Sequence, residues 1–217
     1  RGRCHERGAT LPNDDGDSAE ADSGSQNVFP AADRSLLLLL TKARQLIEQE
    51  RYAEAVQCLG TILDSPEDAF FRPNRKSALY PGLKAEAQAM LGRLPRQGRE
   101  LYELQYGAGA RKLLTAAAAA GDAAGLAEVS RRFFHTSAGY EATLLLGLHY
   151  WNHGSPLAAA LTLKRLRDLS PIAEQFEPAL SMTLAACWLR AGSPEKAGAI
   201  LDEVKQRFPQ AVVRIGG

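Results

Sequence analysis

One stretch of sequence is written twice in the last third of the chain, and it constrains the fold more than any other feature. Both copies pass through the triplet Gly-Ser-Pro, at residues 154–156 and again at residues 192–194. Ten positions match in fixed register around the two glycines, including the triplet itself. Agreement of this kind at helical spacing predicts two copies of one helical hairpin.

The matched residues outside the triplet are apolar, small or aromatic in both copies. They are Leu146 and Leu184, Gly147 and Ala185, Tyr150 and Trp188, Ala159 and Ala197, Leu163 and Leu201, Leu166 and Val204, and Pro171 and Pro209. In each triplet we expect Gly to end the first helix in a left-handed conformation, Ser to cap the second helix, and Pro to take its first position.

These residues resemble the tetratricopeptide repeat, whose pattern of about 34 residues places a small residue, an aromatic, Gly, Ala and Pro in this order. The two copies here lie 38 residues apart, so the linker between them is longer than in the family. The resemblance is good over residues 139–209 and weak over residues 77–134. Residues 34–66 resemble a degraded copy, in which Glu50 stands at the position of the turn glycine.

The sequence therefore predicts an all-α domain over residues 34–210, a right-handed α-solenoid of about five helical hairpins. Its best repeats span residues 139–171 and 177–209. In the earlier part, apolar periodicity and breakers predict a helix over residues 34–49 and a second from Tyr52 that stops before Pro66. Further helices are predicted over residues 77–92, 95–106, 108–120 and 123–134. A loop at residues 65–76 is expected to pack Phe70 or Phe71 onto the first hairpin.

The two ends of the chain differ from this domain. Residues 1–33 hold three Arg against seven Asp and Glu and almost nothing that could pack, so we expect a disordered acidic linker. Residues 211–217 suggest a short strand that begins a following segment. This order of parts resembles the N-terminal helical region of bacterial proteins that continue into a β-propeller of pyrroloquinoline-quinone-enzyme type. The resemblance implies an adjoining C-terminal β-propeller and an exported or periplasmic parent protein.

Composition excludes some functions. The formal net charge is only +1, and the chain has no dense basic stripe, so nucleic acid is not an expected partner. The longest apolar run, residues 36–40, is far shorter than the ~20 residues of a membrane span. The three cysteines show no metal-binding or disulfide spacing, and Cys58 and Cys187 are expected to be small buried residues.

Two histidine motifs could carry chemistry. His149 and His153 lie four residues apart, a spacing that can place two imidazoles on one metal, but Tyr150 stands where a zinc protease needs Glu. His135 precedes Thr136 and Ser137, yet neighbours in sequence do not form a catalytic triad, and a helix boundary with its cap explains them. We expect no catalysis, metal or cofactor at either motif.

Two surface features leave alternatives open. A basic cluster is read as a solvated face or as a site for an anionic partner; its members are Arg72, Arg75, Lys76, Lys84, Arg93, Arg96 and Arg99. Trp151 follows the repeat's own aromatic and points to another side of its helix. It is either core between repeats or an exposed binding aromatic.

A stack of hairpins leaves a concave surface lined by the first helix of each pair. We therefore predict a non-enzymatic scaffold that binds a protein or peptide there. Helical phase selects Tyr140, Thr143, Leu144, Trp151, Ser181 and Arg190 as contact residues. The rivals are the non-catalytic helical region of a larger enzyme, similar to the α-superhelical arms of lytic transglycosylases, and a regulatory module of a transcription factor.

Overall fold

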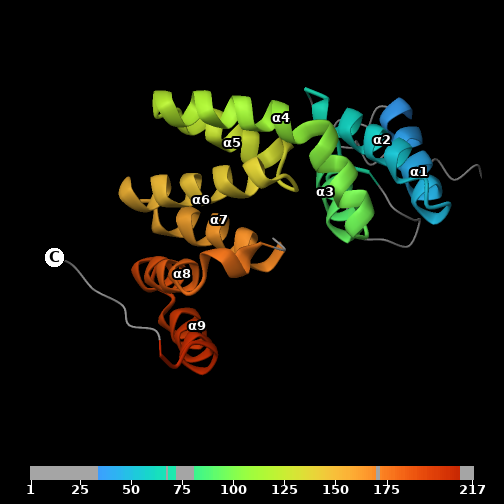
Figure 1. The fold of residues 1–217 in the computed structure, drawn as a ribbon. Helices are drawn as coiled ribbons and strands as arrows, with labels where there is room; N and C mark the ends of the chain where they lie inside the picture. The colour runs from blue at the N-terminus through green and yellow to red at the C-terminus, as the bar shows by residue number, and fades with distance from the viewer. Residues whose placement is uncertain (1–33, 67, 72–80, 170–171, 211–217) are drawn as a thin grey trace, which may run out of the picture.

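The computed structural model describes residues 34–66, 68–71, 81–169 and 172–210, and within these ranges the chain is all-helical (Figure 1). An isolated antiparallel bridge joins Phe70 to Gly82. The expectations for residues 1–33 and 211–217 lie outside the described residues. No helix in the described ranges combines the length and apolar character that a membrane crossing requires.

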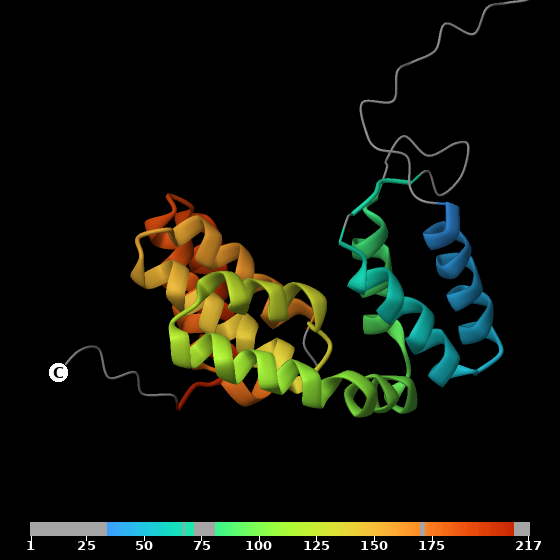
Figure 2. The ribbon, with the colours of Figure 1, turned by 90° about the horizontal axis from the view of Figure 1, so that it is seen from above.

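The helices follow one another in the order of the chain. They are α1 (Arg34–Glu48), α2 (Tyr52–Asp64), α3 (Leu83–Arg93), α4 (Arg96–Ala120), α5 (Ala123–Arg132), α6 (Ser137–Asn152), α7 (Pro156–Leu169), the 3-10 turn η1 (Ala173–Phe176), α8 (Ala179–Arg190) and α9 (Pro194–Arg207). From α4 onward each helix packs against its neighbour in sequence. Helices α1, α2 and α3 form a separate group at the N-terminal end of α4 (Figures 1 and 2).

Four helix pairs are joined by the same left-handed turn. Its central residue has a positive φ at Glu50 (59°), Gly121 (63°), Gly154 (71°) and Gly192 (78°). In each turn the next amide donates to the carbonyl five residues back, as Ser155 N does to Tyr150 O at 2.9 Å and Arg51 N to Leu46 O at 2.9 Å. The pairs are α1/α2, α4/α5, α6/α7 and α8/α9, and the shared turn gives them one local design.

The turn confirms two details of the predicted hairpin and corrects a third. The glycines are left-handed, and proline begins both α7 and α9. Ser193, however, makes no side-chain cap hydrogen bond. Capping by a side chain is seen instead at Asp122, which accepts from Ala124 N, and at Thr136, which accepts from Gly139 N, both at 3.0 Å.

The middle of the chain differs from the prediction. The expected break near residue 107 is absent, because α4 runs unbroken through Gly107 and Gly109. Gly107 is buried and Ala110 packs in the core shared with α5 and α6, and this packing outweighs the low helix propensity of glycine. The α3 helix packs against α2 and does not form a regular hairpin with α4. A solenoid of five hairpins is thus not confirmed, although the all-α architecture is.

The core is continuous from one end to the other. Three groups of buried side chains lie within α1–α3, between α4, α5 and α6, and among α6–α9. Tyr106 packs against the first two groups, and Tyr150 against the last two. As predicted, Cys58 and Cys187 are buried, and Phe71 packs onto the first group while Phe70 is exposed. The two ends are therefore joined by packing along α4 and α6.

Candidate functional site

The first helices of the two regular hairpins, α6 and α8, present matching residues on one face. Leu144, Leu148 and Trp151 follow one stripe of α6, and the 38-residue offset places Met182, Ala186 and Leu189 at the same positions of α8. We call these six residues, together with Arg190, the α6–α8 face. Their spacing of three and four residues puts each set on one side of its helix.

Packing between the helices of each hairpin fixes the orientation of this face. Gly147 lies against Leu163 of α7 so closely that an added Cβ would stand 2.4 Å from Cδ2 of that leucine. The small residue therefore allows α6 to approach α7. The corresponding Ala185 of α8 is also buried. Because these small residues face the second helix of each hairpin, the stripe that contains Leu144 and Trp151 faces away from it.

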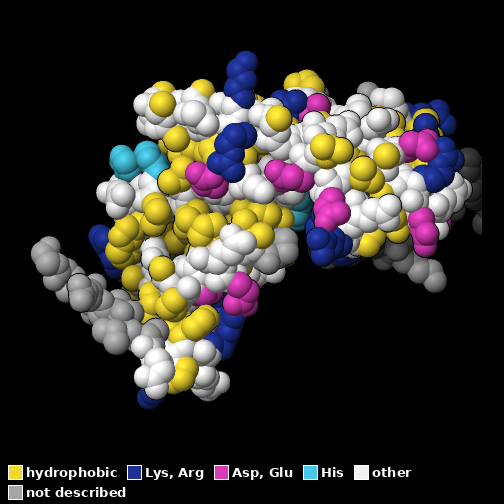
Figure 3. Space-filling view, viewed as in Figure 1, with side chains coloured by type: hydrophobic (Ala, Val, Ile, Leu, Met, Phe, Trp, Pro, Cys, Tyr) yellow, Lys and Arg dark blue, Asp and Glu magenta, His cyan; other side chains and the backbone are white. Residues whose placement is uncertain are grey.

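The α6–α8 face is apolar and only partly covered. Leu189 is 60% exposed, while Leu144, Trp151 and Met182 are half-buried and pack their inner sides against the core. The guanidinium of Arg190 lies over the ring of Trp151, 4.7 Å from its centroid, and this contact joins α8 to α6. In the view of Figure 3, hydrophobic side chains gather over α6, α7 and α8. The α6–α8 face is thus a surface of apolar side chains held in place by the core, with one cation, Arg190, at its end.

Three of the six predicted contact residues do not lie on this surface. Tyr140, Thr143 and Ser181 are buried, whereas Leu144, Trp151 and Arg190 belong to the α6–α8 face. The hydroxyl of Thr143 donates to Gly139 O at 2.7 Å and lies 2.7 Å from the Ser130 hydroxyl. Thr143 thus faces the preceding hairpin, and because all three side chains are buried, the structure does not support their selection as contact residues.

Tyr140 packs its ring edge-on against Phe134, with centroids 5.3 Å apart. Burial raises the pKa of its phenol to about 12. Its position at the start of α6, beneath the loop that follows α5, makes it part of the joint between two hairpins. Tyr140 lies four residues before Leu144, on the same stripe of α6, but at the start of the helix its ring is covered by Phe134.

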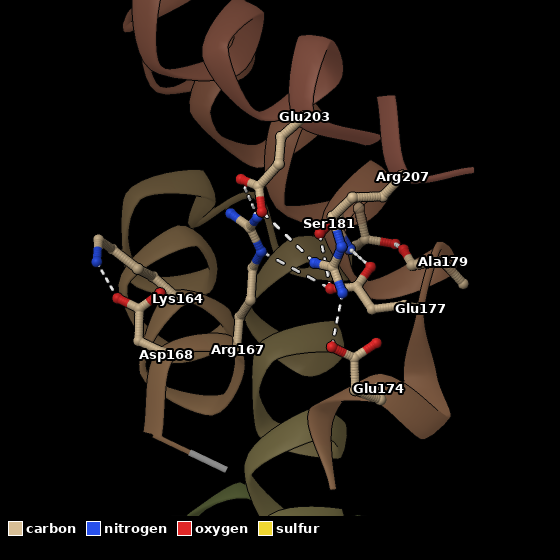
Figure 4. A network of polar contacts seen from close by, with 10 residues as sticks. Lys164, Arg167, Asp168, Glu174, Glu177, Ala179, Ser181, Glu203 and Arg207 are labelled. Atoms are coloured by element: carbon tan, nitrogen blue, oxygen red, sulfur yellow. Dashed lines mark hydrogen bonds and ion pairs between the residues drawn. The ribbon is translucent and has the colours of Figure 1, made fainter. Parts of the chain in front are cut away.

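Ser181 belongs to a polar network that joins α7, η1, α8 and α9 (Figure 4). Its hydroxyl donates to Glu177 Oε1 at 2.8 Å, and the Glu177 side chain is only 3% exposed. Arg167 contacts both Glu177 and Glu203, and Arg207 contacts Glu174 at 2.6 Å. A buried carboxylate with these partners stabilises the linker between the two repeats, so Ser181 has a structural role.

The histidine motifs also have structural roles. The rings of His149 and His153 stack at 3.9 Å, and Nδ1 of His153 lies 2.8 Å from His149 O. The described residues hold no group of three or more His, Cys, Asp or Glu side chains placed to bind a metal. His135 lies against the carbonyl of Gln88 and Thr136 caps α6, so neither is paired as base and nucleophile.

Most of the described members of the basic cluster have separate local partners. Arg96 pairs with Glu100 at 2.7 Å, Arg99 donates to Leu94 O at 2.7 Å, and buried Lys84 donates to Ser65 O at 2.5 Å. Arg93 is exposed. The remaining members, Arg72, Arg75 and Lys76, lie outside the described residues. The described members therefore serve mainly local contacts.

Sequence reasoning missed Leu148, Met182, Ala186 and Leu189. The signal that could have found them is the offset of 38 residues itself: once Leu144 and Trp151 are chosen, their counterparts are Met182 and Leu189. No protein-family model, no curated protein sequence and no solved structure matches this chain.

Proposed function

We propose that this chain is a protein-interaction scaffold that binds a peptide or partner protein on the α6–α8 face and makes or breaks no bond. In this proposal the hairpins belong to a right-handed solenoid of tetratricopeptide type, and α6 and α8 line its concave side. The observation that carries the proposal is the repetition of one partly exposed apolar stripe on two matched helices.

The chemistry of the face suits a peptide with apolar anchors. Exposed apolar residues gathered on one surface favour association, because binding removes their area from water. Arg190 stands at the end of the stripe, where its guanidinium also contacts Trp151. A carboxylate next to the anchors could pair with this guanidinium. The preferred partner is thus an amphipathic segment with large apolar side chains and an acidic residue near one end.

Trp151 is the residue on which the proposal depends most. Its ring packs against the core on one side and under Arg190 on the other. A rigid aromatic that is already held by its neighbours loses little conformational entropy on binding, and such residues are common binding hot spots. Removing the ring should therefore weaken partner binding more than it weakens the fold.

The test is a selection of random peptides displayed on phage against the wild-type protein, followed by affinity measurements with the selected peptides. Leu189→Asp places a charge at the most exposed apolar position of the face, so it should weaken binding at least tenfold. Trp151→Ala should do the same. The matched control is Leu161→Asp, which places the same charge at an exposed position of α7 outside the face.

Circular dichroism melting curves separate contact from fold. Unchanged melting of Trp151→Ala with lost binding identifies a contact residue, and lost stability identifies a core residue. The proposal is wrong if selected peptides bind Leu189→Asp as tightly as wild type. It is also wrong if the purified chain converts any substrate at a measurable rate through these residues.

A further inference from the structure

A hollow lies between α3 and the helices that follow α4, apart from the α6–α8 face. It has a volume of about 650 Å³, and its walls come from α3 on one side and from α5, the loop after α5, and α7 on the other. We call it the α3–α7 groove. Its lining is apolar at Ala85, Ala89 and Phe134, and it holds the side chains of Arg93, Arg131, His135 and Arg165.

Arg165 is the unusual member of this lining. Its guanidinium lies over the ring of Phe134, 4.0 Å from the centroid, and it is half-buried. No carboxylate among the described residues lies within ion-pair distance of it, although Arg167, two residues on, contacts Glu177 and Glu203. Burial without a counter-charge lowers the pKa of the Arg165 guanidinium. A ring face attracts this cation but accepts none of its five N–H donors in the manner of a carboxylate.

His135 supplies a second polar atom without a partner in the same lining. The side chain is only 8% exposed, and its Nε2–H donates to Gln88 O at 2.9 Å. The other ring nitrogen, Nδ1, is buried and has no hydrogen-bond partner. Burial lowers the pKa of this imidazole to about 4, so at neutral pH Nδ1 is an acceptor. Because this nitrogen has almost no accessible surface, it is an unpaired polar atom behind the groove wall and does not face a bound chain.

The acidic groups of the lining are already engaged. Asp68 Oδ1 accepts from the amides of Ala69 and Lys84 at 3.0 and 3.1 Å, and Asp168 pairs with Lys164. Arg93 and Arg165 have no carboxylate within ion-pair distance among the described residues. The groove therefore combines an excess of available cationic donors with an apolar floor. This is the chemistry that holds a carboxylate-bearing peptide.

The chain itself contains a segment of this chemistry. Residues 12–33 hold Asp and Glu at six positions and no Lys or Arg, and five of these acids fall between Asp14 and Asp22. Eleven residues separate Asp22 from Arg34, the first residue of α1, a link whose mean span is roughly 20 Å if it is flexible. The N-terminal ends of α1 and α3 lie at the same end of the α1–α3 group (Figure 2). Arg44 of α1 contacts Glu86 of α3 at 3.4 Å. A link of this length would keep the acidic residues at high local concentration near the α3 wall of the groove.

We propose that the α3–α7 groove binds the acidic segment of residues 12–33 of the same chain, with its carboxylates on Arg165 and Arg93. This site is separate from the α6–α8 face and does not depend on the function proposed for that face. Occupation would join the α1–α3 group to the α5–α7 helices across the groove.

The test uses the full chain with the five acids at 14, 15, 17, 20 and 22 changed to Asn or Gln, so that its own segment no longer competes. A synthetic peptide of residues 12–33 is titrated into this protein by calorimetry. We expect binding that weakens at least tenfold with Arg165→Gln and with Arg93→Gln, and that fails for a peptide with the same five acids neutralised. The unchanged chain should bind the peptide more weakly, because its own segment occupies the groove.

Two controls make the outcome specific. Arg190→Gln, an exposed arginine on the α6–α8 face, should leave peptide binding unchanged. Arg93→Gln removes an exposed side chain, so it tests the groove even if Arg165→Gln reduces stability. The proposal is overturned if the peptide does not bind, if both groove variants bind it equally well, or if inorganic phosphate binds while the peptide does not. Binding that fails with Arg190→Gln instead would place the acidic peptide on the other face and also overturn it.

A spin label tests the intramolecular contact directly. Ser18→Cys in a Cys4→Ser background offers one reactive site, because Cys58 and Cys187 are buried. The nitroxide should broaden the amide signals of Ala85 and Ala89 in α3, and Arg165→Gln should restore them. Broadening spread evenly over the surface would contradict a specific site.

Discussion

The hairpins α6/α7 and α8/α9 match in sequence and in the geometry of their turns, yet equivalent leucines have different environments. Leu163 is fully buried, whereas Leu201 at the same position of the second copy is 42% exposed. The difference arises because α8 packs on α7, while no described helix packs on the outer side of α9. Position in the stack, and not the local pattern, decides how much a repeat residue contributes to stability.

The first hairpin extends this comparison. The α1/α2 turn has the same hydrogen bonds as the later turns but places Glu50 where they have glycine. Its Leu59 and Ile62 are fully buried like Leu163 and Leu166, since α3 and α4 pack against α2. A degraded sequence copy can therefore keep the turn and the core of a regular one.

The largest expected effect contrasts the two matched leucines. Leu163→Ala should lower the free energy of unfolding by about 3 kcal/mol, because it leaves a cavity in a fully buried site. Leu201→Ala should cost about 1 kcal/mol or less, because its side chain is partly in water already. Urea denaturation of both variants measures the difference. Equal losses would show that α9 is covered as fully as α7 and would remove the contrast.

An intermediate effect on stability is expected where the loop after α5 contacts α3. His135 donates to Gln88 of α3, and burial lowers its pKa to about 4. The unfolded chain, with a pKa near 6.5, binds a proton that the folded chain resists, so stability is complete above about pH 6.5 and falls as the pH drops toward 4. Arg165 and Arg99 face the imidazole and oppose its charging.

The expected loss from His135 is about 2 kcal/mol between pH 7 and pH 5. It is measured as the difference between wild type and His135→Gln in urea denaturation at the two pH values. The glutamine amide can keep the donor to Gln88 but takes up no proton. Identical pH dependence in the two proteins would contradict the neutral, buried imidazole.

The smallest effect concerns the turns. Glu50→Gly should stabilise the protein by about 1 kcal/mol, because the left-handed conformation strains a residue with a Cβ. Gly192→Ala should destabilise it by a similar amount for the same reason. Thermal melting followed by circular dichroism detects both shifts. Changes of the same sign would show that the turns of the first and last hairpins are not equivalent.

The sequence predicted part of the candidate site. Leu144, Trp151 and Arg190 were found from helical phase, and the structure places them on one exposed face. Tyr140, Thr143 and Ser181 were selected by the same phase but lie in the interior. Thr143 and Ser181 lie about 100° around their helices from Leu144 and Met182, whereas Tyr140 shares the stripe of Leu144 but is covered at the start of α6. Only the contacts of neighbouring helices resolve that difference.

By itself the sequence determined the helical class, most helix boundaries and the left-handed turns at Gly154 and Gly192, because these depend on interactions between residues close together in the chain. The tertiary structure decided that α4 is one helix, that α3 packs on α2, that Leu163 is buried and Leu201 is not, and that Arg165 and His135 share a groove. Each of these depends on which distant segments come into contact, and a local pattern of apolar residues does not specify its partners.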